Sequence, residues 1–179
     1  MPTYQFTLIV EGPDLQADEL IDALYEAGCD DATLGRANGI QYLDFDRRAD
    51  ALEESILSAV ADLERIGRGV RVVRLADAGL VSMADIASRA GRTREGVRLL
   101  IAGERGPGGF PPPITDPRSR YRLWRWSEVD RWFVTQLREQ PASHDDEVRA
   151  AINAGLELRH YSRHLDPARR LDLRQLAGL

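Results

Sequence analysis

The first part of the chain arranges its hydrophobic and polar residues in two different periods. Residues 4–10 alternate with a period of two and are rich in β-favouring side chains, which predicts a strand. Residues 15–27 and 50–66 repeat their apolar side chains every three or four positions, and a glycine follows each segment. These two segments are therefore predicted to be amphipathic helices.

Three further segments, residues 32–34, 40–45 and 70–75, carry strand-like patterns. The pair Asn38-Gly39 between the first two predicts a tight hairpin turn. The predicted order βαββαβ matches the ferredoxin-like motif, in which two helices cover one face of an antiparallel sheet. Because this fold serves many functions, it does not by itself indicate one.

The middle of the chain predicts two short helices separated by a glycine turn. Ser82 and Asp85 have the spacing of a capping box at the start of the first helix, residues 81–90. Gly91 allows a tight turn, and the second helix is predicted over residues 94–102. Two such helices form a helix-turn-helix, whose second helix enters the major groove of DNA.

The second of these helices is the expected DNA-reading element. Thr93 is placed to cap it, and its apolar residues recur on one face. The exposed residues near its start would reach base edges, where arginine can pair with guanine in bidentate fashion. Those residues are Arg92, Arg94, Glu95 and Arg98.

A basic and aromatic segment follows a loop rich in glycine and proline at residues 103–117. In residues 118–126 arginines alternate with large apolar side chains, which predicts a wing strand whose basic face tracks phosphates. Tyr121, Leu123 and one or both nearby tryptophans are expected to pack beneath this wing. Its basic face consists of Arg118, Arg120 and Arg122.

Ser127 and Asp130 repeat the capping-box spacing and predict the start of a closing helix. The three tryptophans of the chain lie at strand or helix spacing, which favours core packing over stacking on bases. They are Trp124, Trp126 and Trp132.

The C-terminal part contains much leucine. Residues 141–144 interrupt the pattern, residues 145–158 predict an amphipathic helix, and residues 165–179 form a second segment that adds Leu171, Leu173, Leu176 and Leu179. Such an apolar tail requires a partner surface. Three partners stay open: the N-terminal domain of the same chain, a second copy, or another protein.

The net charge of −5 is unevenly distributed along the chain. Residues 1–78 contain 16 acidic and 7 basic residues, whereas residues 89–131 contain 10 basic and 5 acidic residues. All 24 basic residues are arginine. The basic middle favours contact with a polyanion such as DNA, and the alternative is a solvated face that pairs with the acidic N-terminal domain.

The composition and the N-terminal residues indicate where the protein is expected to reside and whether it can form a disulfide. No apolar stretch approaches the roughly 20 residues that cross a bilayer, and the N-terminus lacks the features of a signal peptide, so a cytoplasmic protein is expected. Cys29 is the single cysteine and excludes an intrachain disulfide. The expected domains are residues 1–76, 79–140 and 144–179.

Other residue patterns that could indicate metal binding or catalysis are weak. His160 and His164, with Glu157, have a spacing that could face a metal ion, but exposed polar residues are the stronger interpretation. No nucleotide-binding or hydrolase motif is present, and we expect no enzyme, no cofactor and no metal. A cluster of four aspartates near the predicted hairpin is interpreted as part of a solvated surface rather than as a catalytic or metal-binding site. It consists of Asp30, Asp31, Asp44 and Asp46.

Residues 79–133, which include VSMADIASRAGRTREGVRLL and RYRLWRWSEVDRWF, resemble the winged-helix DNA-binding domain of excisionase, AlpA and MerR-type proteins. The resemblance implies that Thr93, Arg94 and Arg98 face DNA from the second helix. It also implies that the arginines of residues 118–122 belong to the wing. The segment at residues 104–117 is longer and richer in proline than a minimal wing.

Together these features predict a sequence-specific regulator of transcription that binds double-stranded DNA, as a homodimer on paired half-sites. The first alternative is the antitoxin of a toxin–antitoxin module, which would regulate its own gene through the helix-turn-helix and bind a toxin through its C-terminal helices. The second alternative is an excisionase-type factor that bends DNA.

Overall fold

The computed structural model describes residues 1–76, 79–140 and 145–178. They form two compact units, and each is considered by itself: the sheet unit, Met1–Ala76 with Ala151–Leu179, and the central unit, Asp77–Ala150. The predicted interruption at residues 141–144 lies outside the described residues, as do residues 77–78 and Leu179.

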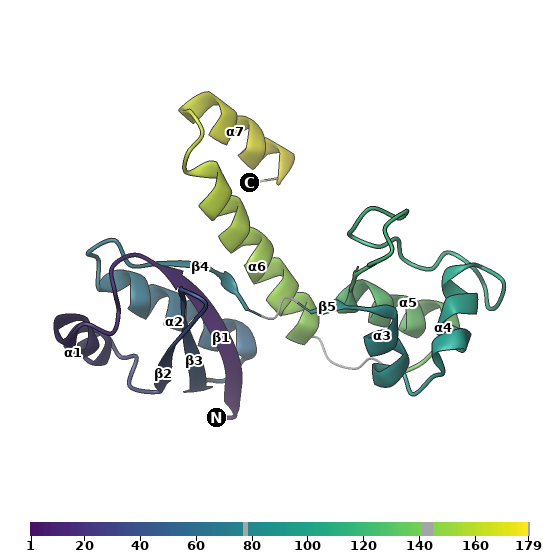
Figure 1. Cartoon of the computed structure of the whole chain (residues 1–179), viewed down its shortest axis with the longest axis horizontal. Coiled ribbons are helices and arrows are strands. Elements are labelled where there is room, and N and C mark those ends of the chain that lie inside the picture. Colours follow the sequence, from purple (N-terminus) through teal and green to yellow (C-terminus); the bar gives the residue numbers. More distant parts are fainter. Residues whose placement is uncertain (77–78, 141–144, 179) are drawn as a thin grey trace. The chain divides into compact units, whose positions relative to one another are not determined.

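The sheet unit is built on a four-stranded antiparallel sheet in the order β2-β3-β1-β4, accompanied by two helices from the same stretch of chain (Figure 1). The predicted mixture of helices and strands is thereby confirmed. The strands are β1 (Thr3–Glu11), β2 (Ala32–Ala37), β3 (Ile40–Arg48) and β4 (Arg71–Leu75). The helices are α1 (Asp18–Glu26) and α2 (Leu52–Arg65).

The predicted hairpin turn between β2 and β3 is confirmed. Ala37 pairs with Ile40, so Asn38 and Gly39 alone connect the strands. Both connecting residues have a positive φ, 50° and 80°. Asparagine and glycine tolerate this left-handed conformation better than other residues, which explains why this pair stands here.

The core of the sheet unit follows the predicted alternation. Phe6, Leu8 and Val10 of β1 are buried on one face, whereas Gln5 and Thr7 point to the other. On that outer face Gln5 donates to Asp46 and Thr7 donates to Asp44, at 2.7 and 2.6 Å. The acidic residues of β3 are therefore exposed hydrogen-bond acceptors spread along a strand.

Arg47 breaks the simple pattern of the core, because it is a buried charge with only 7% of its surface exposed. Its guanidinium forms ion pairs of 2.8 Å with both Asp31 and Asp62 and donates to the Gly28 carbonyl at 2.8 Å. Burial by itself lowers the pKa of Arg47, but the hydrogen bonds and charges of the two aspartates outweigh it and raise this pKa. The network joins the start of β2 to β3 and α2.

Cys29 lies beside this network, and its thiol is buried. Burial raises the pKa of the thiol from 9.0 to about 11, although the charge of Arg47 acts in the opposite direction. Two pKa units reduce the thiolate fraction near neutral pH about a hundredfold. A thiolate of raised pKa is also more nucleophilic, so we expect Cys29 in the native protein to react with a disulfide reagent at least about tenfold more slowly than in the unfolded chain. Equal rates in the presence and absence of denaturant would contradict this expectation.

The C-terminal helices are α6 (Asp145–Ser162) and α7 (Pro167–Leu176). Helix α6 extends beyond its predicted end, and in the sheet unit it buries Asn153 and Leu156. The Asn153 side-chain oxygen accepts a hydrogen bond of 2.9 Å from the Leu75 amide of β4. Helix α7 has no buried residue, and Leu176 is 85% exposed.

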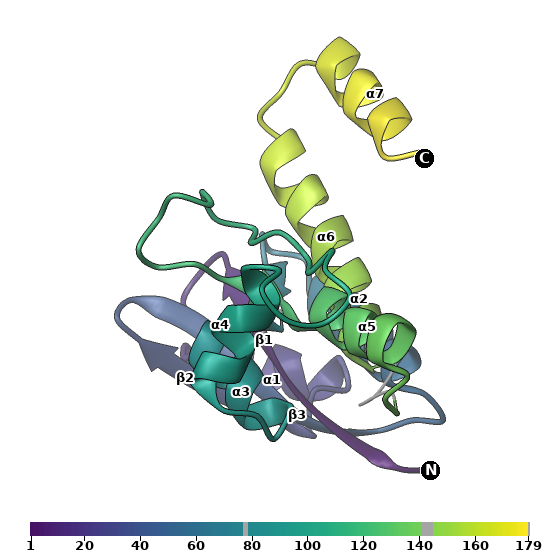
Figure 2. The same cartoon turned by 90° about the vertical axis from the view of Figure 1, so that its right-hand side faces the viewer.

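Among the described residues, the central unit contains three complete helices, the first residues of α6 and a two-stranded antiparallel ribbon, and its first two helices lie side by side in Figures 1 and 2. Its hydrophobic core includes all three tryptophans, which confirms the prediction that they pack inside. Its elements are β5 (Leu80–Val81), α3 (Met83–Arg89), α4 (Arg94–Ile101), β6 (Trp124–Arg125) and α5 (Trp126–Leu137).

The predicted wing strand over residues 118–126 is wrong for most of its length. Only Trp124 and Arg125 are in a strand, because the partner β5 contains only two residues. The residues before them fold into local turns, in which the Asp116 side chain accepts from the Arg118 amide at 2.9 Å. Tyr121, which was expected to pack beneath a wing, is 79% exposed.

The predicted cap of the closing helix is also wrong. Helix α5 begins at Trp126, one residue before Ser127, and its N-cap Arg125 makes no side-chain capping bond. The Trp126 amide instead donates to the Gly79 carbonyl at 2.7 Å, and the Trp126 ring is buried. Tertiary packing of this ring therefore overrides the local capping signal, and Ser127 is buried inside the first turn.

Candidate nucleic-acid interface

The first helix of the central unit is capped as its sequence predicts. The Ser82 hydroxyl accepts from the Asp85 amide at 3.3 Å, and the Asp85 carboxylate accepts from the Ser82 amide at 2.8 Å. The hydrogen bonds from the Ser82 side chain and backbone lower the pKa of Asp85. This reciprocal pair sets the start of α3 and the direction in which the chain enters it.

A tight turn places the second helix next to the first. Gly91 has a φ of 59°, a conformation that favours glycine, and the Arg92 amide donates to the Ala87 carbonyl at 2.8 Å. The Thr93 hydroxyl accepts from the Gly96 amide at 3.0 Å and caps α4, as predicted. Val97 is fully buried, and the charged residues of α4 lie on its exposed side.

The basic loop, residues 114–123, is the second part of the candidate interface. Its ends are held together because the Ile114 amide donates to the Leu123 carbonyl at 2.8 Å and the Leu123 amide donates to the Thr115 hydroxyl at 3.2 Å. The indole N–H of Trp124 donates to the Pro111 carbonyl at 3.1 Å and holds the segment that leads into the loop. The loop therefore closes on itself without being a strand pair.

Three of the predicted DNA-binding arginines meet at one hollow of about 310 Å³. Arg94 comes from the first turn of α4, and Arg120 and Arg122 come from the basic loop. Within the part of the chain that the structure describes, Arg94 and Arg120 have no carboxylate partner. The Arg122 guanidinium lies 5.6 Å from the centre of the Trp124 ring. The full lining is Ser82, Met83, Ala84, Arg94, Arg120, Tyr121, Arg122, Leu123 and Trp124.

Other predicted site residues are engaged within the protein. Arg98 forms ion pairs with Glu95 at 3.0 Å and with Glu104 at 3.3 Å. The hydrogen bond from Arg98 lowers the pKa of Glu95, and the two glutamates raise the pKa of Arg98. Arg118 pairs with Asp116 at 2.8 Å. Any contact of Arg98 or Arg118 with a phosphate or a base would compete with these carboxylates.

Arg92 is directed toward the core of the central unit. Its guanidinium pairs with Glu139 and lies 5.3 Å from the centre of the Phe133 ring. Its Nε atom is buried, and no hydrogen-bond partner for that atom is found among the described residues. Thr93 is occupied as a helix cap, so both residues have evident structural roles. Their expected contacts with DNA stay predictions.

Sequence reasoning missed two features of this hollow. Tyr121 was assigned to the core because it alternates with arginines, but it is exposed beside Arg120 and Arg122. Ser82 was expected only to cap α3, and it also lines the hollow. No signal in the sequence indicates either position, because the path of the loop depends on contacts that are distant along the chain.

The alternative metal site at the C-terminus does not assemble. Glu157 accepts from Asn153 at 2.9 Å, His160 Nδ1 lies 3.8 Å from Glu11, and His164 Nε2 accepts from the Arg163 side chain at 2.9 Å. Among the residues described, no group of three or more histidine, cysteine or acidic side chains is placed to hold a metal ion.

The same described residues include no helix that is both long and apolar enough to span a membrane. We compared the chain with protein-family models, with curated protein sequences and with solved structures, and none of these comparisons found a match.

Proposed function

We propose that the central unit is a winged helix-turn-helix domain that binds double-stranded DNA, and that the protein is a sequence-specific regulator of transcription. The sheet unit would then be a ferredoxin-like domain attached to it, since its strand order and antiparallel directions fit that motif. In this proposal α4 enters the major groove, and the basic loop acts as the wing along the backbone.

The observation that carries the proposal is the convergence of Arg94, Arg120 and Arg122 on one hollow. Elsewhere in the central unit, Arg98, Arg118 and Arg131 are paired with carboxylates. Unpaired guanidinium groups have all their N–H donors available, and phosphate oxygens and guanine edges are suitable acceptors.

Arg94, Arg120 and Arg98 are expected to play different roles, because they lie at different places in the unit. Arg94 lies at the start of α4, where residues of such a helix reach base edges. Arg120 lies on the loop and is expected to contact phosphate, which adds affinity for every sequence. Arg98 would have to exchange Glu95 and Glu104 for DNA, so its net contribution is expected to be smaller than that of Arg94.

The proposal is tested by titrating the full chain against its own promoter fragment and a scrambled duplex at two salt concentrations. We expect Arg94→Ala to weaken promoter binding by about 1 to 3 kcal/mol and to reduce the preference for the promoter. Arg120→Ala should weaken binding to both duplexes equally. It should also reduce the slope of log affinity against log salt concentration by about 0.9, the effect of one lost phosphate contact.

Arg131→Ala is the matched control, because it removes one positive charge from the same unit at an arginine that already pairs with Glu147. Its binding should stay close to that of the wild type. Equal losses in Arg94→Ala and Arg131→Ala would show that only net charge matters, and an absence of binding at low salt would refute DNA binding by this unit.

A second candidate function is that of an antitoxin, which one observation favours. Helix α7 buries none of its residues, and its apolar side chains include Leu171, which is 56% exposed. Exposed leucines on a short helix fit a role in binding another protein or a second copy of the chain. Co-expression with the product of the adjacent gene, followed by co-purification with and without Leu171→Ser, would distinguish this candidate from a regulator that acts alone.

A further inference from the structure

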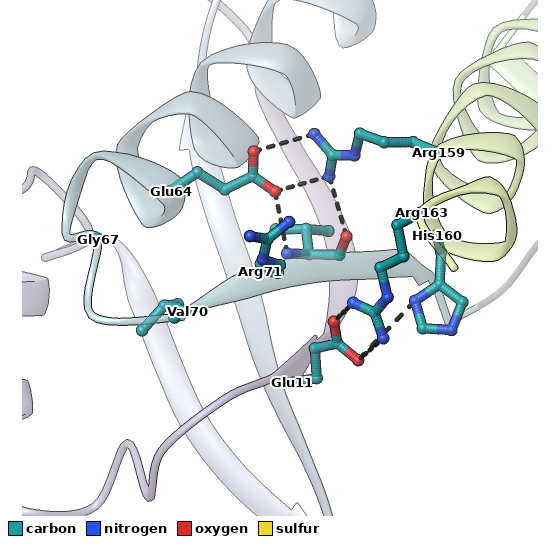
Figure 3. Close-up of a pocket in the computed structure, with 10 residues that line it drawn as sticks. Glu11, Glu64, Gly67, Val70, Arg71, Arg159, His160 and Arg163 are labelled. Atoms are coloured by element: carbon teal, nitrogen blue, oxygen red, sulfur yellow. Dashed lines mark hydrogen bonds and ion pairs between the residues drawn. The ribbon is translucent and has the colours of Figure 1, made fainter. Parts of the chain in front are cut away.

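The sheet unit contains a polar cavity of about 360 Å³ that is separate from the candidate DNA interface (Figure 3). It is bounded by the end of β1, the start of β4, the loop after α2, and the last turns of α6. Its chemistry comes from six charged or titratable side chains drawn together in Figure 3. They are Glu11, Glu64, Arg71, Arg159, His160 and Arg163.

Two ion pairs form the walls of this cavity. Arg159 contacts both oxygens of Glu64, at 2.6 and 2.9 Å, and Arg163 contacts both oxygens of Glu11. Arg159 and Glu64 also bind the edge strand β4. Arg159 donates to the Val72 carbonyl at 3.0 Å, and Glu64 accepts from the Val72 amide at 3.2 Å. The guanidiniums of the walls are therefore held in place before any ligand arrives.

The third arginine of the cavity is different. In the view of Figure 3, Arg71 lies between the two ion pairs. Its backbone is held in β4 opposite Glu11 of β1. Among the residues that the structure describes, its guanidinium has no ion pair and no hydrogen-bond partner. Arg71 therefore offers five N–H donors that the protein itself does not use.

The balance of donors and acceptors determines what this cavity can bind. The carboxylates of Glu11 and Glu64 already accept from two arginines, whereas Arg159 and Arg163 keep N–H groups beyond those that the ion pairs use. Three guanidiniums face two carboxylates, so the fixed charge is +1 before His160 is counted. The cavity therefore has unused hydrogen-bond donors and an excess of positive charge, so it can bind a ligand that supplies hydrogen-bond acceptors and negative charge.

We propose that this cavity is a binding site for a small oxyanion, a molecule that carries a phosphate or carboxylate group, with Arg71 as its principal ligand. A guanidinium matches both groups with two parallel hydrogen bonds. The volume falls at the lower end of the range for small-molecule sites, which fits a small metabolite rather than a polymer. The proposal does not depend on DNA binding, because every residue in it belongs to the sheet unit.

The test is isothermal titration calorimetry of the full chain in a chloride buffer at constant ionic strength, with inorganic phosphate, inorganic pyrophosphate and succinate as probes. We expect saturable binding of at least one probe. The Arg71→Gln variant should bind it about tenfold more weakly or worse, since one hydrogen bond between charged groups contributes on that order. Comparison of phosphate with succinate identifies whether the site takes a phosphate-bearing or a carboxylate-bearing molecule.

Arg74→Gln is the control, because Arg74 is an exposed arginine of the same strand that does not line the cavity. It should bind the probe as the wild type does. The proposal is overturned if no probe binds saturably, or if both variants lose affinity equally. Neither variant removes an ion pair of the described structure, so both are expected to fold, and unfolding curves in the absence of the probe verify this.

Discussion

Replacement of Arg47 by methionine is expected to lower the free energy of unfolding of the sheet unit by about 3 kcal/mol. The methionine would fill much of the same volume, but Asp31 and Asp62 would lose the charge that they face and the Gly28 carbonyl would lose its donor. Both aspartates keep some exposure to solvent, which places the expected loss at the lower end of the range for a broken buried ion pair.

The measurement uses Cys29 as a reporter. This thiol is buried in the sheet unit, so its reaction with a disulfide reagent in increasing denaturant follows the opening of that unit. Arg48→Met is the control, because Arg48 is the exposed neighbour on β3. Equal midpoints for Arg47→Met and Arg48→Met would show that the buried network contributes nothing to stability.

A second large effect is expected in the central unit, where Trp124→Ala should cost about 3 to 5 kcal/mol. Trp124 is 1% exposed, and its ring stands in the core formed by α3, α4 and α5. Its indole N–H also holds the Pro111 carbonyl ahead of the basic loop. The substitution leaves a cavity in the core and releases this loop, so DNA binding should fall with stability.

All three tryptophans of the chain lie in the central unit, so tryptophan fluorescence reports on that unit alone. In Trp124→Ala the remaining tryptophans should show an earlier transition in urea, while the reactivity of Cys29 stays unchanged. Trp124→Phe separates packing from hydrogen bonding, because it keeps most of the ring but loses the bond to Pro111. An equal shift of both reporters would mean that the two units unfold as one.

Local signals in the sequence predicted several elements correctly. The Ser82–Asp85 capping box, the Thr93 cap and the Asn38-Gly39 turn all form as expected. Each depends on atoms only a few residues apart, so the short segment already contains the interaction that stabilises it. Hydrophobic periodicity predicted the strands and helices of the sheet unit for the same reason, because a strand or helix turns one side of its own chain toward the core.

The errors came from positions where distant contacts compete with local patterns. The alternation of arginines and aromatics from Arg118 onward predicted a strand, but a strand requires a partner, and β5 pairs with only Trp124 and Arg125. Ser127 had the spacing of a cap, but burial of the Trp126 ring moved the start of α5. The role of Arg47 could not be predicted, because its partners lie 15 and 16 residues away.

Composition and charge patterning were sufficient to locate the basic part of the chain and to nominate arginines for DNA. They could not distinguish Arg94 and Arg120, which have no carboxylate partner among the described residues, from Arg98, which is paired with two glutamates. The oxyanion cavity has no counterpart in any local pattern, because α6 follows β4 by many residues. Propensity and periodicity act along the chain, whereas the pairing of charges and the shape of a site depend on which segments the folded core brings together.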